Sequence, residues 1–302
     1  MKVGHAGTLD PAATGVLPVL LGKATRVAEY LVNWDKQYRA VLRLGETTDT
    51  QDATGTVLRR APVAQVTEAE VREAVARFVG RIRQVPPMYS AVKVAGVPLY
   101  KAARAGRNVE RHAREVTVAR IDVLAVDLPD VTLRVTCSKG TYIRTLCADI
   151  GEALGVGGHL LTLDRERTGP LTVEQALTVE EVESRLARGT LGESLLTLDA
   201  ALAELPACTV GPDTARRVVH GAPVSPRDVT GWEPCGAEAS GSGDRAIRIK
   251  DQGGRLLAIG TVRGLAIGQG EGQGRAEGSI AVTKVFVSEG SDGREVRNLI
   301  EE

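Results

Sequence analysis

Two alternating stretches of sequence separated by a short turn constrain the fold most. Residues 115 to 126 and 131 to 137 alternate apolar with polar side chains, the pattern of half-buried β-strands. Only residues around Leu128-Pro129-Asp130 are left for the reversal, so we predict an antiparallel hairpin. Residues 38 to 44 alternate in the same way, and a further strand is predicted at Val57-Leu58 after a polar loop.

Helical periodicity marks three other segments. Thr67 and Glu70 form the capping-box pattern at the start of a predicted helix over residues 67 to 79. A short helix is predicted near residues 99 to 106, and a second amphipathic helix over residues 141 to 154. Strands and helices do not alternate as regular βαβ units, which indicates an α+β fold with a largely antiparallel, mixed sheet.

The character of the sequence changes between residues 196 and 206. Three short strands are predicted beyond this point, at residues 246 to 250, 255 to 262 and 280 to 287. Loops rich in glycine and serine, 236 to 244 and 268 to 278, precede the first and the third of these strands. A chain of 302 residues exceeds the usual single-domain size, so we predict a large domain followed by a small β-barrel-like module.

Composition bears mainly on which functions are unlikely. Lys and Arg together number 38 and so do Asp and Glu, so a basic surface for nucleic acid must be local. The four cysteines lack a C-x-x-C spacing and the four histidines do not cluster near them, so we expect no zinc site and reduced thiols. Neither a membrane-spanning apolar run nor a signal peptide is evident, and we expect a cytoplasmic protein.

The stretch GHAGTLDP at residues 4 to 11 has a more specific pattern. An Asp followed by Pro usually caps a helix, but Gly15, Pro18 and Gly22 leave room for only one or two helical turns here. Capping therefore accounts for Asp10 and leaves the surrounding glycines and histidine unexplained.

Four blocks of sequence together resemble the bacterial tRNA pseudouridine synthase B family. They are GHAGTLDPAATGVLPVLLGKAT (4–25), DKQYRAVLRLGETTDTQDATG (35–55), VPPMYSAVKVAG (85–96) and CSKGTYIRTLCADIG (137–151). The resemblance covers residues 2 to about 200 in the family's order. It implies the pseudouridine-synthase fold and an isomerase that converts the T-loop uridine at tRNA position 55 to pseudouridine, with no cofactor or metal.

The resemblance also implies roles for individual residues. Asp10 corresponds to the family's nucleophile, and aspartate is ordinarily ionised at pH 7 without an activating base. Tyr38 corresponds to the tyrosine that stacks on the flipped base and takes part in proton transfer, and Arg144 to the arginine that pairs with the catalytic carboxylate. The substrate-binding positions implied are His5, Tyr142, Leu163 and Lys139.

Each role has a simpler structural alternative. An aromatic residue in an alternating strand, such as Tyr38, is more often part of the core. Arg144 by its spacing alone could be a surface cation in a helix, and His5 a loop histidine bonded to backbone.

The sequence departs from the family pattern after Leu163. Asp164 and Arg165 follow it where the family usually has two basic residues.

A basic stretch lies between residues 80 and 120, where nine Lys and Arg accompany two Glu. The family's corresponding insertion, about 80–115 here, folds onto the RNA stem-loop through phosphate contacts. The resemblance therefore implies a catalytic domain over 1–198 and, more weakly, a PUA-type RNA-binding domain over 205–288, with a charged tail at 289–302. Family members carry about 35 to 40 residues before GHAGTLDP, so we expect that this chain lacks a strand beside the active site.

Two other functions are alternatives for this sequence. A non-catalytic tRNA-binding or tRNA-folding protein could retain the same scaffold, but binding alone does not require Asp10, Tyr38, Tyr142 and Arg144 together. An aspartyl phosphotransferase would need a second carboxylate for Mg²⁺, and Ala12 occupies that place. The predicted partner is the T-arm of tRNA, without DNA or membrane, and the expected oligomeric state is a monomer.

Overall fold

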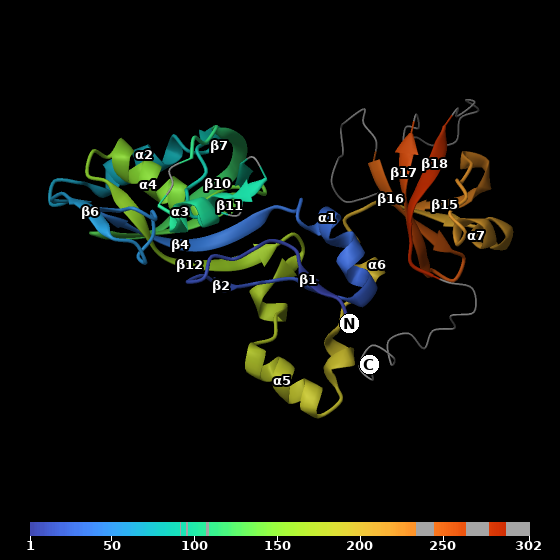
Figure 1. Ribbon diagram of the computed structural model, residues 1–302. Coiled ribbons are helices and arrows are strands. Elements are labelled where there is room, and N and C mark those ends of the chain that lie inside the picture. Colours follow the sequence, from blue (N-terminus) through green and yellow to red (C-terminus); the bar gives the residue numbers. More distant parts are fainter. Residues whose placement is uncertain (91, 95, 107–108, 234–244, 264–277, 288–302) are drawn as a thin grey trace. The chain divides into compact units, whose positions relative to one another are not determined.

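Two β-sheets organise the chain (Figure 1). The computed structural model describes residues 1–302 except 91, 95, 107–108, 234–244, 264–277 and 288–302. Contacts between residues divide the chain into two units. The large-sheet unit comprises His5–Val19 and Glu29–Ala176, and the small-sheet unit comprises Met1–Gly4, Leu20–Ala28 and Leu177–Glu302.

The large sheet has seven strands, in the order β13-β12-β4-β11-β10-β7 with β2 beside β12. Every pairing is antiparallel except that of β2 with β12, which confirms the predicted antiparallel, mixed sheet. The strands are β2 (Thr14–Gly15), β4 (Lys36–Leu44), β7 (Gly80–Gln84), β10 (Arg114–Asp127), β11 (Asp130–Cys137), β12 (Gly158–Thr168) and β13 (Leu171–Thr172).

The predicted hairpin is formed by β10 and β11. Asp127 lies opposite Asp130, so the turn consists of Leu128 and Pro129 and is one residue tighter than predicted. Outside the large sheet, β5 (Glu46–Thr48) pairs with β6 (Val57–Arg60), and β8 (Lys93–Val94) pairs with β9 (Val97–Pro98).

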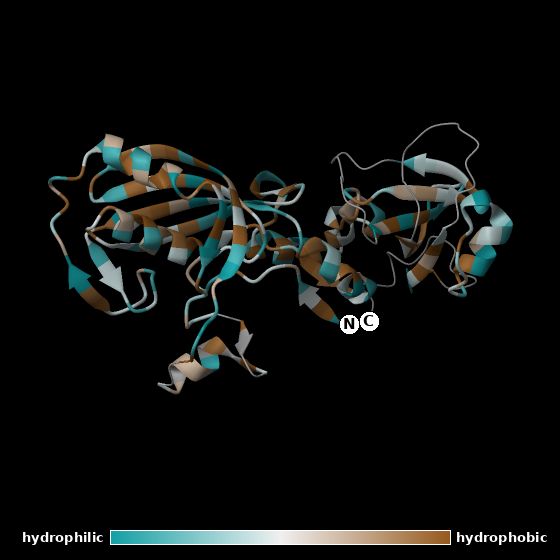
Figure 2. Cartoon of the chain, turned by 90° about the horizontal axis from the view of Figure 1, so that it is seen from above, coloured by the Kyte–Doolittle hydropathy of each residue, from teal (hydrophilic) through white to brown (hydrophobic). Residues whose placement is uncertain are grey.

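Two helices, α2 (Glu68–Ala76) and α4 (Ile143–Ala153), pack against the large sheet. The capping box of α2 is present: the Glu70 amide donates to Thr67 Oγ1 and the Thr67 amide to Glu70 Oε2. Both helices are shorter than predicted. Their apolar faces share one core with β4, β11 and β12, where hydrophobic and hydrophilic residues alternate along the strands (Figure 2). The short helix α3 (Leu99–Arg104) was also predicted.

The small-sheet unit contains a five-stranded sheet in the order β15-β14-β16-β17-β18. Three of its strands are the predicted ones: β16 (Arg245–Asp251), β17 (Leu256–Arg263) and β18 (Ser279–Val285). Most of each glycine-rich loop and the tail at 289–302 lie outside the described residues. The other elements are β14 (Ala207–Val210), β15 (Val229–Glu233), α5 (Val179–Ala187), α6 (Leu198–Ala201) and α7 (Pro212–Val218).

Short elements complete the described chain: β1 (Val3–His5), β3 (Val19–Leu21), α1 (Ala28–Leu31) and the 3₁₀ helices η1 (Gly22–Val27), η2 (Val173–Gln175), η3 (Leu191–Ser194) and η4 (Pro226–Asp228). The described chain has no helix with the length and apolar character needed to span a bilayer.

Candidate active site

Asp10 lies in the loop between β1 and β2, and no helix begins at Pro11. The Ala13 amide donates to the Asp10 carbonyl over 2.9 Å and closes a single turn. The helix-capping interpretation is therefore wrong for Asp10. The Asp10 side chain is 37 % exposed, so an external substrate can reach it.

Arg144 binds that carboxylate from the first turn of α4. Its Nε lies 2.8 Å from Asp10 Oδ2, and its Nη2 donates to Asp10 Oδ1 over 3.0 Å. Only 4 % of the Arg144 side chain is exposed, so this arginine is not a surface helix cation. A two-point contact from a buried guanidinium fixes both the position and the orientation of the carboxylate.

Three further groups surround the Arg144 guanidinium. Its Nη1 lies 3.4 Å from Asp52 Oδ2 and donates to the Thr50 carbonyl, while Nη2 donates to the Tyr89 carbonyl. Asp52 is itself held, because the amide and hydroxyl of Thr54 donate to its Oδ1. Asp52 belongs to the second resembling block, although no role was predicted for it.

The start of α4 is fixed by Gln84 at the end of β7. The Tyr142 amide, at the N-cap of α4, donates to Gln84 Oε1, and Gln84 Nε2 donates back to the Tyr142 carbonyl. Gln84 is buried. These two bonds tie the first turn of α4, and with it Arg144, to the edge strand of the sheet.

Tyr38 and Leu163 lie on adjacent strands of the large sheet. Tyr38 on β4 is opposite Arg165 on β12, and Leu163 on β12 is opposite Ala40. Leu163 is buried, and Tyr38 is partly buried against the same core. The strand pairing thus brings the predicted aromatic and aliphatic side chains into one region of the sheet.

Two ionisable groups here have shifted pKa values. Burial raises the pKa of Tyr38, while the nearby Arg165 guanidinium acts in the opposite direction. Burial, followed by the charge of Arg165, lowers the pKa of Lys36 from 10.5 to about 8. The Lys36 ammonium donates to the Val32 and Trp34 carbonyls.

His5 and Lys139 are exposed, and the described residues show no hydrogen bond or ion pair from either to Asp10 or Arg144. His5 is the last residue of β1. Lys139 lies in the turn that precedes α4, and its ammonium donates to Asn33 Oδ1. Their predicted contacts with substrate stay predictions.

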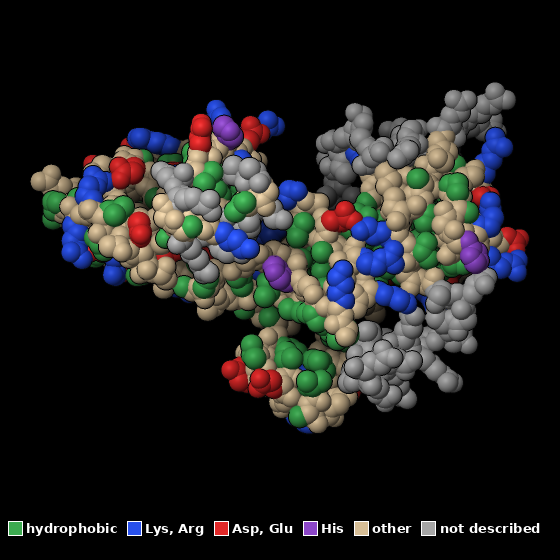
Figure 3. Space-filling view, viewed as in Figure 1, with side chains coloured by type: hydrophobic (Ala, Val, Ile, Leu, Met, Phe, Trp, Pro, Cys, Tyr) green, Lys and Arg blue, Asp and Glu red, His purple; other side chains and the backbone are tan. Residues whose placement is uncertain are grey.

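The basic stretch is only partly described. Arg107 lies outside the described residues, as do the side chains of Lys93 and Arg104. Arg81 and Arg114 are exposed on β7 and β10, and Arg81 lies 3.9 Å from Glu115. Lys and Arg share this part of the surface with acidic side chains (Figure 3).

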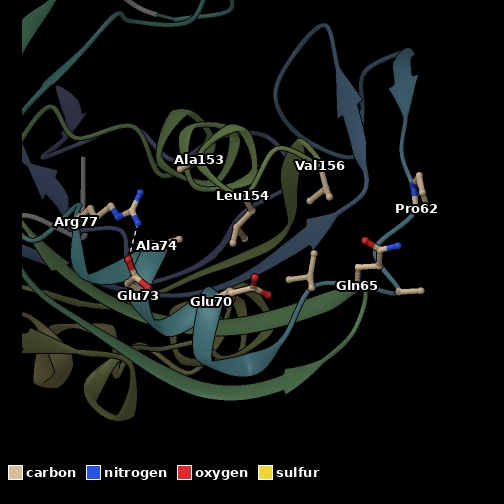
Figure 4. Close-up of a pocket in the computed structure, with 11 residues that line it drawn as sticks. Pro62, Gln65, Glu70, Glu73, Ala74, Arg77, Ala153, Leu154 and Val156 are labelled. Atoms are coloured by element: carbon tan, nitrogen blue, oxygen red, sulfur yellow. Dashed lines mark hydrogen bonds and ion pairs between the residues drawn. The ribbon is translucent and has the colours of Figure 1, made fainter.

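A hollow of about 620 Å³ lies between α2 and the C-terminal end of α4 (Figure 4). Ala153 and Leu154 line it, nine and ten residues along from Arg144. At 1.5 Å per residue, this end of α4 is roughly 14 Å from the Asp10 contact. The hollow is therefore separate from the site built around Asp10.

The arrangement suits nucleophilic chemistry on an electrophilic carbon. It presents an accessible carboxylate, held by one buried arginine, in the same unit as an aromatic and an apolar side chain that could contact a flat base. Among the residues that the structure describes, no three His, Cys, Asp or Glu side chains are grouped to hold a metal ion.

Family models and curated relatives that match this chain are described as tRNA pseudouridine synthases of the TruB type. Residues 1–143 match the family model described as TruB family pseudouridylate synthase (N terminal domain), and residues 144–204 match the tRNA pseudouridylate synthase B C-terminal domain. The tRNA pseudouridine synthase B of Ralstonia nicotianae is 53% identical over 224 residues, covering 73% of this chain and 71% of that protein. That of Pseudomonas aeruginosa is 44% identical over 266 residues, covering 86% and 83%.

Solved structures of more distant proteins share the fold. A Cbf5-Nop10-Gar1 complex contains a chain that is 28% identical, with a TM-score of 0.70, covering 95% of this chain and 76% of that one. An H/ACA RNP bound to a substrate RNA containing 2'-deoxyuridine contains one that is 27% identical, with a TM-score of 0.71, covering 96% and 78%. These similarities confirm the predicted fold class.

Proposed function

The chain belongs to the TruB family of tRNA pseudouridine synthases, isomerases that convert uridine to pseudouridine in tRNA, and we propose that Asp10 is its nucleophile. The observation that carries this proposal is the contact between the exposed Asp10 carboxylate and the buried Arg144 guanidinium. A non-catalytic tRNA-binding function is not favoured.

In the proposed reaction the Asp10 carboxylate adds to the target nucleotide, at ribose C1′ or at ring C6. The N1–C1′ glycosidic bond breaks, the uracil turns, C5 bonds to C1′, and the bond to Asp10 breaks, which regenerates the free carboxylate. The proton on C5 is then lost and N1 gains one, so the product is an isomer of the substrate. Arg144 keeps the carboxylate aimed at the nucleotide throughout.

Tyr38, Tyr142 and Leu163 form the proposed pocket for the flipped base. Extruding a base from its stack costs a few kcal/mol, which an aromatic face and an apolar contact offset. Tyr38 is partly buried beside this core and Leu163 is buried, in keeping with such a pocket. Tyr38 also takes part in proton transfer in this proposal.

The T-arm stem-loop of tRNA, with its position-55 uridine, is the proposed substrate. His5 and Lys139 contact the RNA beside the flipped nucleotide, and the insertion at about 80–115 binds phosphates of the stem. We further propose a catalytic domain over 1–198, a PUA-like RNA-binding domain over 205–288, a monomeric state and action in the cytoplasm.

An unmodified tRNA transcript tests this function. After incubation with the chain, nucleoside analysis should show one pseudouridine per tRNA, formed in the T-loop. A transcript with cytidine in place of that uridine is the matched control and should yield none. Equal conversion of both transcripts would refute the T-loop assignment, and tight binding without conversion would support the non-catalytic alternative.

A further inference from the structure

Arg165, on β12, is a buried cation that has no carboxylate partner among the residues that the structure describes. Its residue exposure is 1 %, and none of the ion pairs found among the described residues involves it. Taking a guanidinium out of water is costly unless its N–H groups find acceptors. Two backbone carbonyls supply them here: Nε donates to Val16 over 2.7 Å and Nη2 donates to Gly7 over 3.1 Å.

Those two carbonyls belong to opposite ends of the segment that carries Asp10. Gly7 precedes Asp10 by three residues and Val16 follows it by six. The backbone of Arg165 holds the same segment, because the Val16 amide donates to the Arg165 carbonyl over 2.8 Å. One residue therefore closes the Asp10 loop at both ends.

Close packing leaves that loop little freedom at its C-terminal end. Gly15 has a φ of +97°, and a Cβ there would lie 2.3 Å from the Arg165 carbonyl oxygen. Only glycine fits both this conformation and this approach. The loop thus lies directly on the Arg165 backbone.

Arg165 also faces the second proposed catalytic residue. Its Cα partner on β4 is Tyr38, and cross-strand partners in a sheet project from the same face. Burial raises the pKa of Tyr38, and the nearby positive charge of Arg165 acts in the opposite direction. The guanidinium is therefore within reach of the phenol as well as of the loop.

We propose that Arg165 is a positioning residue, whose guanidinium fixes the Asp10 loop to β12, beside the strand that carries Tyr38. This role rests on the proposed function of Asp10 and Tyr38, and it is separate from that of Arg144. Arg144 orients the carboxylate itself, whereas Arg165 fixes the backbone from which the carboxylate projects. A single ammonium cannot span both carbonyls as the planar guanidinium does, so lysine should not replace it.

Single-turnover tritium release from a C5-labelled T-arm, with enzyme in saturating excess, tests this role. We expect Arg165→Lys and Arg165→Ala to lower the rate constant by about 100-fold, because displacement by about 1 Å is enough for such a loss. The dissociation constant for the RNA should change by less than about threefold, since no RNA contact is assigned to Arg165. Guanidinium ion at low millimolar concentration should raise the rate constant of Arg165→Ala about tenfold, because the ion can occupy the site that the side chain has left.

Arg167→Lys is the matched control. Arg167 lies on the same strand and donates to Asp35 and the Gly169 carbonyl, so its substitution should leave the rate constant unchanged. A merely structural role for Arg165 would lower the reaction amplitude, as the folded fraction falls, and leave the rate constant of the folded molecules as in the unsubstituted chain. That outcome, or a full rate in Arg165→Lys, would overturn the inference. Failure of the proposed function would appear differently, as no release by the unsubstituted chain.

Discussion

Arg144 connects segments that are far apart in sequence: Asp10, the loop holding Thr50 and Asp52, and the Tyr89 carbonyl. The pairing of Arg144 with Asp10 was predicted only through the resemblance to the family, because the spacing of Arg144 alone favours a surface cation in a helix. The contact with Asp52 could not be predicted, since an ion pair between residues about 90 positions apart leaves no periodic signal in the chain. For the same reason, no role was predicted for Arg165, which was noted only as the residue after Asp164, where the sequence departs from the family pattern.

Lys36 offers a prediction about pH and stability. In the folded chain burial lowers its pKa to about 8 from the ordinary 10.5. Between these values the unfolded chain binds more protons, so the free energy of unfolding should gain a contribution that grows with pH, up to about 3 kcal/mol. Below pH 8 both states are protonated and this contribution is absent.

Urea unfolding of the unsubstituted chain and of Lys36→Met, from pH 7 to 10.5, measures this effect. The free energy of unfolding of the unsubstituted chain minus that of Lys36→Met should increase as pH rises above 8. Titration of the cysteines and tyrosines occurs in both proteins and largely cancels in the difference. Two parallel pH curves would show that Lys36 keeps an ordinary pKa.

The elements that sequence predicts well are those with a clear period. The β10–β11 hairpin, β4, α2 and α4 each combine regular alternation or a helical face with a turn or cap signal. β12, which pairs with β4, β13 and β2, was missed because Asp164, Arg165, Glu166 and Arg167 follow one another in its second half. Arg165 occupies a buried position where an alternating strand normally has an apolar residue. This buried cation interrupts the alternation, so the strand could not be predicted from the pattern.

The packing of α4 on β12 should control activity through Gly151. A Cβ at this position would lie 2.3 Å from the Gly158 amide nitrogen, so Gly151→Ala must push the helix away from the backbone beside β12. We expect a loss of about 1 to 3 kcal/mol of stability. Turnover should also fall, because α4 carries Arg144.

The control variant Ala153→Gly separates the effect of displacing α4 from the effect of lowering the stability of the fold. Ala153 is exposed near the end of the same helix, and glycine there costs up to about 1 kcal/mol without pressing on β12. Single-turnover rates should be unchanged in Ala153→Gly and reduced in Gly151→Ala. Equal rates in the two variants would mean that the position of α4 does not limit the reaction.

At the scale of the whole molecule, every predicted site residue belongs to the large-sheet unit: His5, Asp10, Tyr38, Lys139, Tyr142, Arg144 and Leu163. Each unit has its own buried core. The chemical step should therefore depend on the large-sheet core and be insensitive to the other one.

Two isoleucine truncations test this separation. Ile150 and Ile249 are both fully buried, the first in the large-sheet core and the second in the small-sheet core. Each change to alanine should cost about 2 to 5 kcal/mol of stability in its own unit. At saturating enzyme and low temperature, Ile150→Ala should lower the single-turnover rate and Ile249→Ala should not. A lowered rate in Ile249→Ala would show that the chemistry extends beyond the large-sheet unit.

The central claim is that the Asp10 carboxylate performs the chemistry, and tritium release from C5-labelled T-arm RNA tests it most directly. Asp10→Asn should bind the RNA normally and release no tritium above background. Asp130→Asn, which alters another two-point carboxylate–arginine pair on the same sheet, should release tritium at the unsubstituted rate. Tritium release by Asp10→Asn at a rate comparable to the unsubstituted chain would contradict the account and assign the nucleophile elsewhere.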